Sequence, residues 1–164
     1  MSSYLKIGIK KKQIRTGFTI IELIIVIAII STLAVVAIPM VETSVKRERE
    51  IVLKRSLREL RSAIDDYHDF ILKNKIKHDD ETYAYPEELE ILVKGIEYRD
   101  KKNKAKIRKF LRRIPADPMT GLIEWGLRSY QDKRNSTHWG GENIWDIYSK
   151  SDKKALNGSY YKEW

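Results

Sequence analysis

The feature that most constrains this chain is an uncharged run of 19 residues, Leu23 to Val41. As an α-helix this run is about 28 Å long, close to the thickness of the hydrocarbon core of a bilayer. A helix this apolar can also be the buried core of a soluble domain, but this one is too long for that and directly follows a basic cluster. The run therefore predicts a membrane-inserted helix.

A basic leader precedes the run. Residues 1–17 contain no acid and hold five of the nine net positive charges of the chain, which leaves +4 for the rest. The basic residues are Lys6, Lys10, Lys11, Lys12 and Arg15. Positive residues before the helix predict that Met1 stays cytoplasmic and that the chain after Val41 is exported. We interpret the mildly basic remainder as an ordinary solvated surface.

Glu22 lies at the edge of the apolar run, where an ordinary membrane anchor has no use for it. A carboxylate costs roughly 2.5–3.5 kcal/mol at the centre of a bilayer and less near its edge. One interpretation is that Glu22 is hydrated at the headgroup level. The other is that it pairs with a cation of another chain, such as a free amine at Phe18 created by a cut after Gly17. A desolvated pair of that kind distinguishes correct from incorrect helix packing.

Three residues interrupt the apolar run. Ser31 and Thr32 can return their hydroxyl hydrogen bonds to carbonyl groups one turn back, at little cost. Pro39 removes a backbone donor and clashes with the carbonyl of Val35, which predicts a kink or a short melted section just before it. Copies of the same helix packed together would shield the freed carbonyls from lipid.

The order of these features resembles the class III signal of type IV pilins and type II secretion pseudopilins. The matching features are a basic leader ending in Gly17, then Phe18-Thr19-x-x-Glu22, then an apolar run with Pro39 near its end. The resemblance implies that a prepilin peptidase cuts after Gly17 and methylates the new N-terminal residue, Phe18. It also implies that Glu22 pairs with the N-terminal amine of a neighbouring subunit, so Glu22 and Pro39 are the expected assembly residues.

A second cleavage site remains open. Val35-Val36-Ala37 has the small residues that an ordinary signal peptidase accepts, and the mature chain would then begin at Ile38. That cut would leave Glu22 without a role, and Pro39 would lie beside it.

Beyond the membrane segment, residues 42–73 have the period of an amphipathic helix. Six apolar residues form one stripe: Leu53, Leu57, Leu60, Ile64, Tyr67 and Ile71. The apolar and amphipathic segments are predicted to form one helix of roughly 50 residues, which the polar segment 74–81 ends. Later residues must cover the stripe.

The rest of the chain predicts short elements. The sequence from Tyr85-Pro86 to Leu92 reads as a short helix that Gly95 ends. Residues 99–113 contain nine Lys or Arg but only one aromatic residue, which favours a solvated loop or a subunit contact over a nucleic-acid site. The prolines and glycine of 114–121 predict a turn. Strands are predicted at 124–131 and 143–149, in a small antiparallel sheet lying on the amphipathic helix.

The chain carries four tryptophans, which we assign to the core and to packing contacts rather than to a sugar-binding strip. They are Trp125, Trp139, Trp145 and Trp164.

The C-terminal half resembles, more loosely, the major pseudopilin of type II secretion systems. The matching segments are Tyr85-Pro86, 115–121 and 146–149. The resemblance implies a pilin-like α+β fold, with a long N-terminal helix packed against a small antiparallel sheet. The expected organisation is a cleaved leader (1–17), a transmembrane and filament-core helix (18–41) and a periplasmic domain (42–164). That domain comprises the amphipathic helix (42–73), a short helix with loops (85–121) and the sheet with the C-terminal segment (122–164).

The region in which major pseudopilins usually bind calcium departs from the family. Asp152 is the only acid in 150–158 and has three lysines around it, whereas calcium takes six to eight oxygen ligands with several carboxylates. We therefore predict no cofactor, with Asp152 as a weak calcium candidate. The chain has no cysteine, so the disulfide-closed loop of many type IV pilins cannot form, which favours a pseudopilin.

No catalytic constellation is recognisable in the sequence, and His68, His78 and His138 are scattered. The predicted function is a structural subunit of a periplasmic pseudopilus for type II secretion, anchored in the bacterial inner membrane. Its expected partners are copies of itself, the prepilin peptidase, other pseudopilins and inner-membrane assembly proteins, with nucleic acid disfavoured. The alternatives are a type IV pilin or DNA-uptake pseudopilin, and, from another class, a monomeric membrane-anchored periplasmic binding domain.

Overall fold

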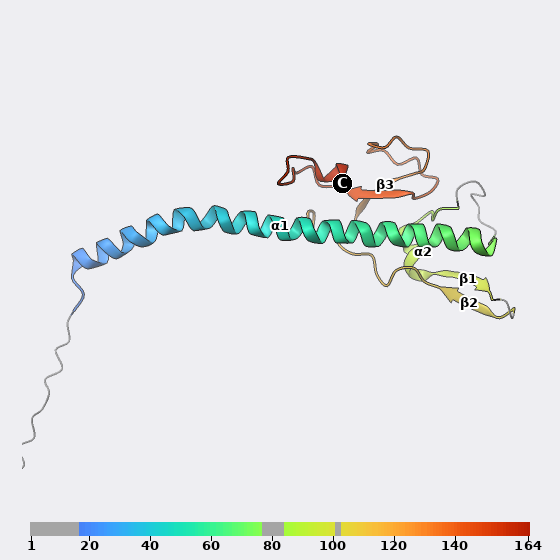
Figure 1. The fold of residues 1–164 in the computed structure, drawn as a ribbon, viewed down its shortest axis with the longest axis horizontal. Helices are drawn as coiled ribbons and strands as arrows, with labels where there is room; N and C mark the ends of the chain where they lie inside the picture. The colour runs from blue at the N-terminus through green and yellow to red at the C-terminus, as the bar shows by residue number, and fades with distance from the viewer. Residues whose placement is uncertain (1–16, 77–83, 101–102) are drawn as a thin grey trace, which may run out of the picture. The chain divides into compact units, whose positions relative to one another are not determined.

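The computed structural model describes residues 17–76, 84–100 and 103–164, without the side chains of 36–39 (Figure 1). Within these ranges the fold is α+β and pilin-like: the long N-terminal helix α1 (Ile20–Asn74), the short helix α2 (Leu89–Lys94) and two small antiparallel sheets. The strands are β1 (Ile96–Arg99), β2 (Ala105–Arg108), β3 (Trp125–Arg128) and β4 (Asp146–Ser149), and a 3-10 turn η1 (Tyr161–Glu163) follows. The chain divides into two compact units, with the boundary between Glu42 and Thr43.

The first unit contains the apolar half of α1. The most apolar 18-residue window of the helix has a mean hydropathy of 2.9, and none of it is buried against the rest of the chain. By length and composition this segment can cross a membrane. The helix continues through position 39, where the sequence predicts a kink or a melted section.

The second unit is built on the amphipathic half of α1. All six residues of the predicted stripe are buried, with 3% or less of their surface exposed. They form one core with α2, the β3–β4 sheet and the C-terminal segment, whose apolar members include Leu92, Trp125, Ile147 and Tyr161. The prediction that later residues cover the stripe is confirmed.

Helix α2 begins three residues later than the sequence suggests. Pro86 lies before the helix rather than in its first turn, and Leu89 and Leu92 are the residues that it buries. Gly95 ends it, as predicted: its N–H donates to the Ile91 carbonyl at 2.8 Å and its φ is +84°. A Cβ at this position would lie 2.5 Å from the Arg108 carbonyl oxygen, so β2 approaches the backbone closely here.

Part of the basic segment 99–113 forms a hairpin where a loop was predicted: Arg99 ends β1 and residues 105–108 form β2. Strands β1 and β2 pair antiparallel with Tyr98 opposite Lys106, and β1 alternates half-buried with exposed residues. The ring of Tyr98 packs edge-on against Phe70 at the distal end of α1. All four residues of β2 are exposed, its lysine and arginine among them, so the basic side chains of this strand are open to solvent.

The C-terminal sheet is present but shorter than predicted. Strands β3 and β4 pair antiparallel, four residues each, with Gly126 opposite Tyr148. A Cβ on Gly126 would lie 2.2 Å from the Tyr148 ring, so only glycine allows the ring to lie across the strand at this position. Trp125 is buried as expected, whereas Trp139 and Trp145 are about 40% exposed, so these two lie outside the core, although Trp145 packs edge-on against Tyr130.

A partly buried ion cluster joins the sheet to α1. Asp146 on β4 accepts hydrogen bonds from Arg61 Nε at 2.6 Å and from Arg128 Nη1 at 3.1 Å. Arg128 also donates to the carbonyls of Ser136 and Lys162, and its guanidinium lies 4.2 Å from the centre of the Tyr148 ring.

The C-terminal segment 150–164 is held against α1 by further polar contacts. The Glu50 carboxylate accepts from the Leu156 N–H at 2.7 Å and from the Tyr161 hydroxyl at 2.9 Å. Arg61 donates to the Trp164 carbonyl at 2.8 Å, and the Lys54 ammonium lies 4.5 Å from the centre of the Trp164 ring. These contacts position the end of the chain beside the middle of the helix (Figure 1).

Candidate processing and assembly site

The predicted cleavage site lies just before α1 in non-helical backbone. Gly17, Phe18 and Thr19 precede the first helical residue, Ile20, and all three are exposed. The Phe18 side chain is 78% exposed, and among the described residues no atom beyond the neighbours of Gly17 in the chain lies within 4 Å of where its Cβ would be. The described part of the chain therefore leaves the Gly17–Phe18 bond accessible, as the substrate bond of a peptidase must be.

Thr19 caps the helix that starts here. Its hydroxyl oxygen accepts from the Glu22 N–H at 3.3 Å, and its carbonyl accepts from the Leu23 N–H at 3.1 Å. Thr19-x-x-Glu22 is also the sequence of a capping box, a local signal for a helix start that the resemblance alone overlooks. Glu22 thus lies in the first turn, where a carboxylate interacts favourably with the helix dipole.

The backbone N–H of Glu22 takes part in the helix cap, and the side chains around this end of the helix are exposed. Ile20 and Ile21 are well exposed, as are the apolar side chains from Leu23 to Val35 that make up this surface. The carboxylate is therefore displayed at one end of a long apolar surface.

Further along, Thr32 behaves as predicted. Its hydroxyl donates to the Ile29 carbonyl at 2.8 Å, so its polar group is satisfied within the helix. Position 39 is helical backbone, and its side chain lies outside the described residues, as do residues 1–16 of the leader.

The weak calcium candidate, Asp152, lies apart from this site in the C-terminal segment. Its side chain is 90% exposed, and Lys162 Nζ lies 3.4 Å from its Oδ1. Among the described residues, no three His, Asp or Glu side chains are grouped to hold a metal ion. The adjacent turn is closed by its own backbone: the Ala155 N–H donates to the Ser159 carbonyl at 2.8 Å.

Comparison with known families identifies the same stretch of sequence. A family model described as the prokaryotic N-terminal methylation motif matches residues 13–38, which include Gly17, Phe18 and Glu22. No curated protein and no solved structure gives a significant match. Together with an apolar N-terminal helix that is consistent with membrane anchoring, the motif supports a type IV pilin-like subunit that is processed as a prepilin.

Proposed function

We propose that this chain is a pseudopilin: a structural subunit that polymerises into a periplasmic pseudopilus for type II protein secretion. The observation that carries the proposal is the methylation motif at 13–38, whose exposed Gly17–Phe18 bond immediately precedes an exposed apolar helix. A prepilin peptidase cuts that bond and methylates Phe18. The apolar segments of many copies then pack together and form the filament core.

Glu22 selects the correct packing in this scheme. The cut creates a cationic amine at Phe18, and the first turn of a neighbouring helix offers the Glu22 carboxylate. In a bundle that excludes water, an unpaired carboxylate is costly, whereas a paired one is compensated. Assembly would therefore accept only the helix displacement that brings the two groups together.

The orientation in this proposal places the leader in the cytoplasm and residues 42–164 in the periplasm. Lys and Arg are as frequent after the apolar run as before it: the leader holds five, and residues 42–61 hold seven. The charge bias therefore does not decide the orientation alone. The prepilin-type motif supports it, because the peptidase of that family is a membrane enzyme that acts on the leader side.

The secretion pseudopilus is favoured over a type IV pilus because the chain has no cysteine. Its partners in this role are copies of itself, the peptidase, other pseudopilins and inner-membrane assembly proteins. A type IV pilin or DNA-uptake pseudopilin is the second candidate, and the exposed basic ribbon of β1 and β2 is the observation that favours it. A role without catalysis follows from this proposal.

The decisive experiment is mass spectrometry of the mature N-terminus, combined with two variants. We expect a chain that begins at N-methylated Phe18, and Gly17→Val to leave the leader attached. Glu22→Ala should be processed and inserted normally but should lose filament formation. Glu42→Ala removes an exposed acid from the other end of the apolar run and is the matched control. A mature chain that begins at Ile38 would exclude the proposal.

A further inference from the structure

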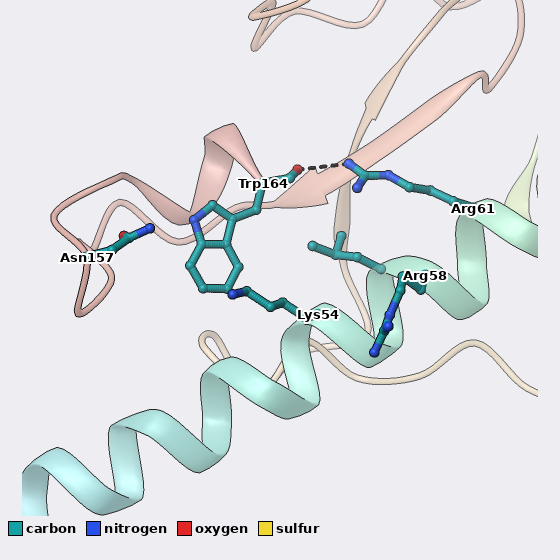
Figure 2. Close-up of a pocket in the computed structure, with 6 residues that line it drawn as sticks. Lys54, Arg58, Arg61, Asn157 and Trp164 are labelled. Atoms are coloured by element: carbon teal, nitrogen blue, oxygen red, sulfur yellow. Dashed lines mark hydrogen bonds between the residues drawn. The ribbon is translucent and has the colours of Figure 1, made fainter.

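One side of α1 carries a basic pocket within the second unit. The pocket has a volume of about 420 Å³, and Figure 2 shows how its side chains lie. It is lined by Lys54, Leu57, Arg58, Arg61, Asn157 and Trp164, a set with three cations and no acid. We call Lys54, Arg58 and Arg61 the basic flank of α1.

The three cations differ in how far the chain itself engages them. Lys54 lies over the Trp164 ring, and Arg61 is bonded to Asp146 and to the Trp164 carbonyl. Arg58 is exposed and extends along the helix away from Trp164 (Figure 2). Among the described residues Arg58 makes no ion pair. Lys54 and Arg58 thus have no carboxylate partner among the described residues, and Arg61 shares the single carboxylate of Asp146 with Arg128, so the basic flank keeps a net positive charge.

A second exposed side of α1 carries acids. Glu59 and Asp66 lie five residues after Lys54 and Arg61 respectively, which turns them by about 140° around the helix axis. Both are exposed, and neither makes an ion pair among the described residues. Arg55 is exposed one turn before Glu59 and partly offsets the negative charge of Glu59. Asp66 therefore contributes most of the negative charge on this side of the helix. We call Glu59 and Asp66 the acidic flank.

We propose that the basic flank of one copy binds the acidic flank of a second copy of this chain. Lys54 and Arg61 are seven residues apart, and so are Glu59 and Asp66. A parallel neighbour displaced by five residues, about 7.5 Å along the axis, therefore brings both cations opposite both acids. Because the two flanks are different surfaces, the contact is heterologous and repeats from copy to copy, as an open filament requires.

This inference rests on the proposed function and deepens it. In the pair Phe18–Glu22 the cation also comes first in the sequence and the acid follows, four residues later. Both pairs therefore need the neighbour to be displaced in the same direction, so that its acid lies level with the cation of the first copy. The displacement of each pair is counted along its own part of α1. The basic and acidic flanks select the direction of stagger, as the Glu22 pairing does.

Cysteine cross-linking of the full chain in membranes tests the contact directly, because the chain has no cysteine of its own. We expect K54C/E59C to give a ladder of dimers, trimers and longer products on oxidation. Five residues rise about 7.5 Å, which exceeds the roughly 7 Å limit between the Cα atoms of a disulfide, so the bond cannot form within one helix. The single variants can give dimers at most.

The matched control is K54C/E48C. Glu48 is exposed and projects from the same side of the helix as Glu59, but it lies six residues before Lys54 and so needs the opposite stagger. We expect no ladder from this pair. Equal ladders from both pairs would overturn the proposed register.

Charge reversal gives an independent test. K54E and E59K should each reduce filament formation roughly fivefold, and the two combined should restore it because the pair is re-formed with its charges exchanged. If K54E reduces assembly and E59K does not, the basic flank binds another anion, such as a lipid phosphate, and the proposal is wrong. If all these variants assemble normally while Glu22→Ala does not, the proposed function stands without this contact. If the unmodified chain forms no filament at all, the proposed function itself fails.

Discussion

At the scale of single residues, Asp146 holds the most demanding position in the second unit. Its two oxygens accept from Arg61 and Arg128, and the Arg128 side chain is only 5% exposed. The partners lie 85 and 18 residues away in the sequence. No local pattern could reveal them, although Asp146 itself stands out in the Asp-x-Tyr-Ser segment.

Removing this carboxylate should be costly. Asp146→Ala leaves two guanidinium groups facing each other, one of them almost fully buried, so we expect the free energy of unfolding to fall by about 3–5 kcal/mol. Urea denaturation followed by tryptophan fluorescence measures this change. Asp152→Ala is the control: it removes an exposed ion pair with Lys162 and should cost less than about 1 kcal/mol. Similar losses in the two variants would contradict the structural role of the cluster.

Tyr161 should make stability depend on alkaline pH. Burial, and then the hydrogen bond to Glu50, raise the pKa of Tyr161 from 10.0 to about 12. Between these values the unfolded chain loses the proton while the folded chain keeps it, so the stability present below pH 10 declines as pH rises toward 12. Burial and the nearby Glu87 also raise the pKa of Tyr67 to about 12, so both residues contribute.

Unfolding at pH 9 and pH 11.5 measures this effect. Tyr161→Phe should make the loss of stability between the two pH values smaller. Tyr160→Phe removes a hydroxyl from an exposed ring and should leave the loss unchanged. An unaltered pH dependence in Tyr161→Phe would show that the hydroxyl ionises equally in both states.

At the scale of elements, Glu50 joins the C-terminal segment to the helix. It satisfies the Leu156 N–H and the Tyr161 hydroxyl together. Glu50→Ala leaves both donors without this acceptor, and we expect a loss of roughly 2–4 kcal/mol. Hydrogen exchange should show the loosening locally, with faster exchange at Leu156 and little change in α2. Glu48→Ala, an exposed neighbour on the same helix, should change neither measurement.

The elements also show what a sequence can predict and what it cannot. The stripe from Leu53 to Ile71 follows from period alone, and every member is buried. The hairpin β1–β2 escaped prediction because its lysines and arginines dominate the composition and obscure the alternation around Ile96 and Tyr98. Trp139 and Trp145 were assigned to the core by residue type, and their exposure depends on loop conformations that no period encodes.

At the scale of the whole molecule, the two units differ in how they bury apolar surface. Within the described ranges, every member of the hydrophobic core lies between Leu53 and Trp164, in the second unit. We therefore expect residues 43–164 to fold alone, with one cooperative urea transition. The native tryptophan fluorescence should match that of the full chain in detergent, and a fragment without a cooperative transition would show that the apolar segment contributes to the core.

The signals that mark the candidate site are local in sequence, and for this reason a short motif is enough to indicate it. Gly17, Phe18 and Glu22 lie within six residues, and the family motif spans 13–38. What sequence reasoning missed there is the capping role of Thr19, which depends on where the helix begins. The basic and acidic flanks of α1 could not be predicted from the sequence for another reason. Which charged residues share an exposed side of the helix can be decided only once its buried face is known.

The polar contacts that join the C-terminal segment to α1 have a mechanical consequence. Glu50 and Arg61 are 11 residues apart, about three turns of helix, with Lys54 between them. A force that pulls the C-terminal segment along α1 would load these three contacts together, in shear, so we expect them to share the force instead of breaking one after another.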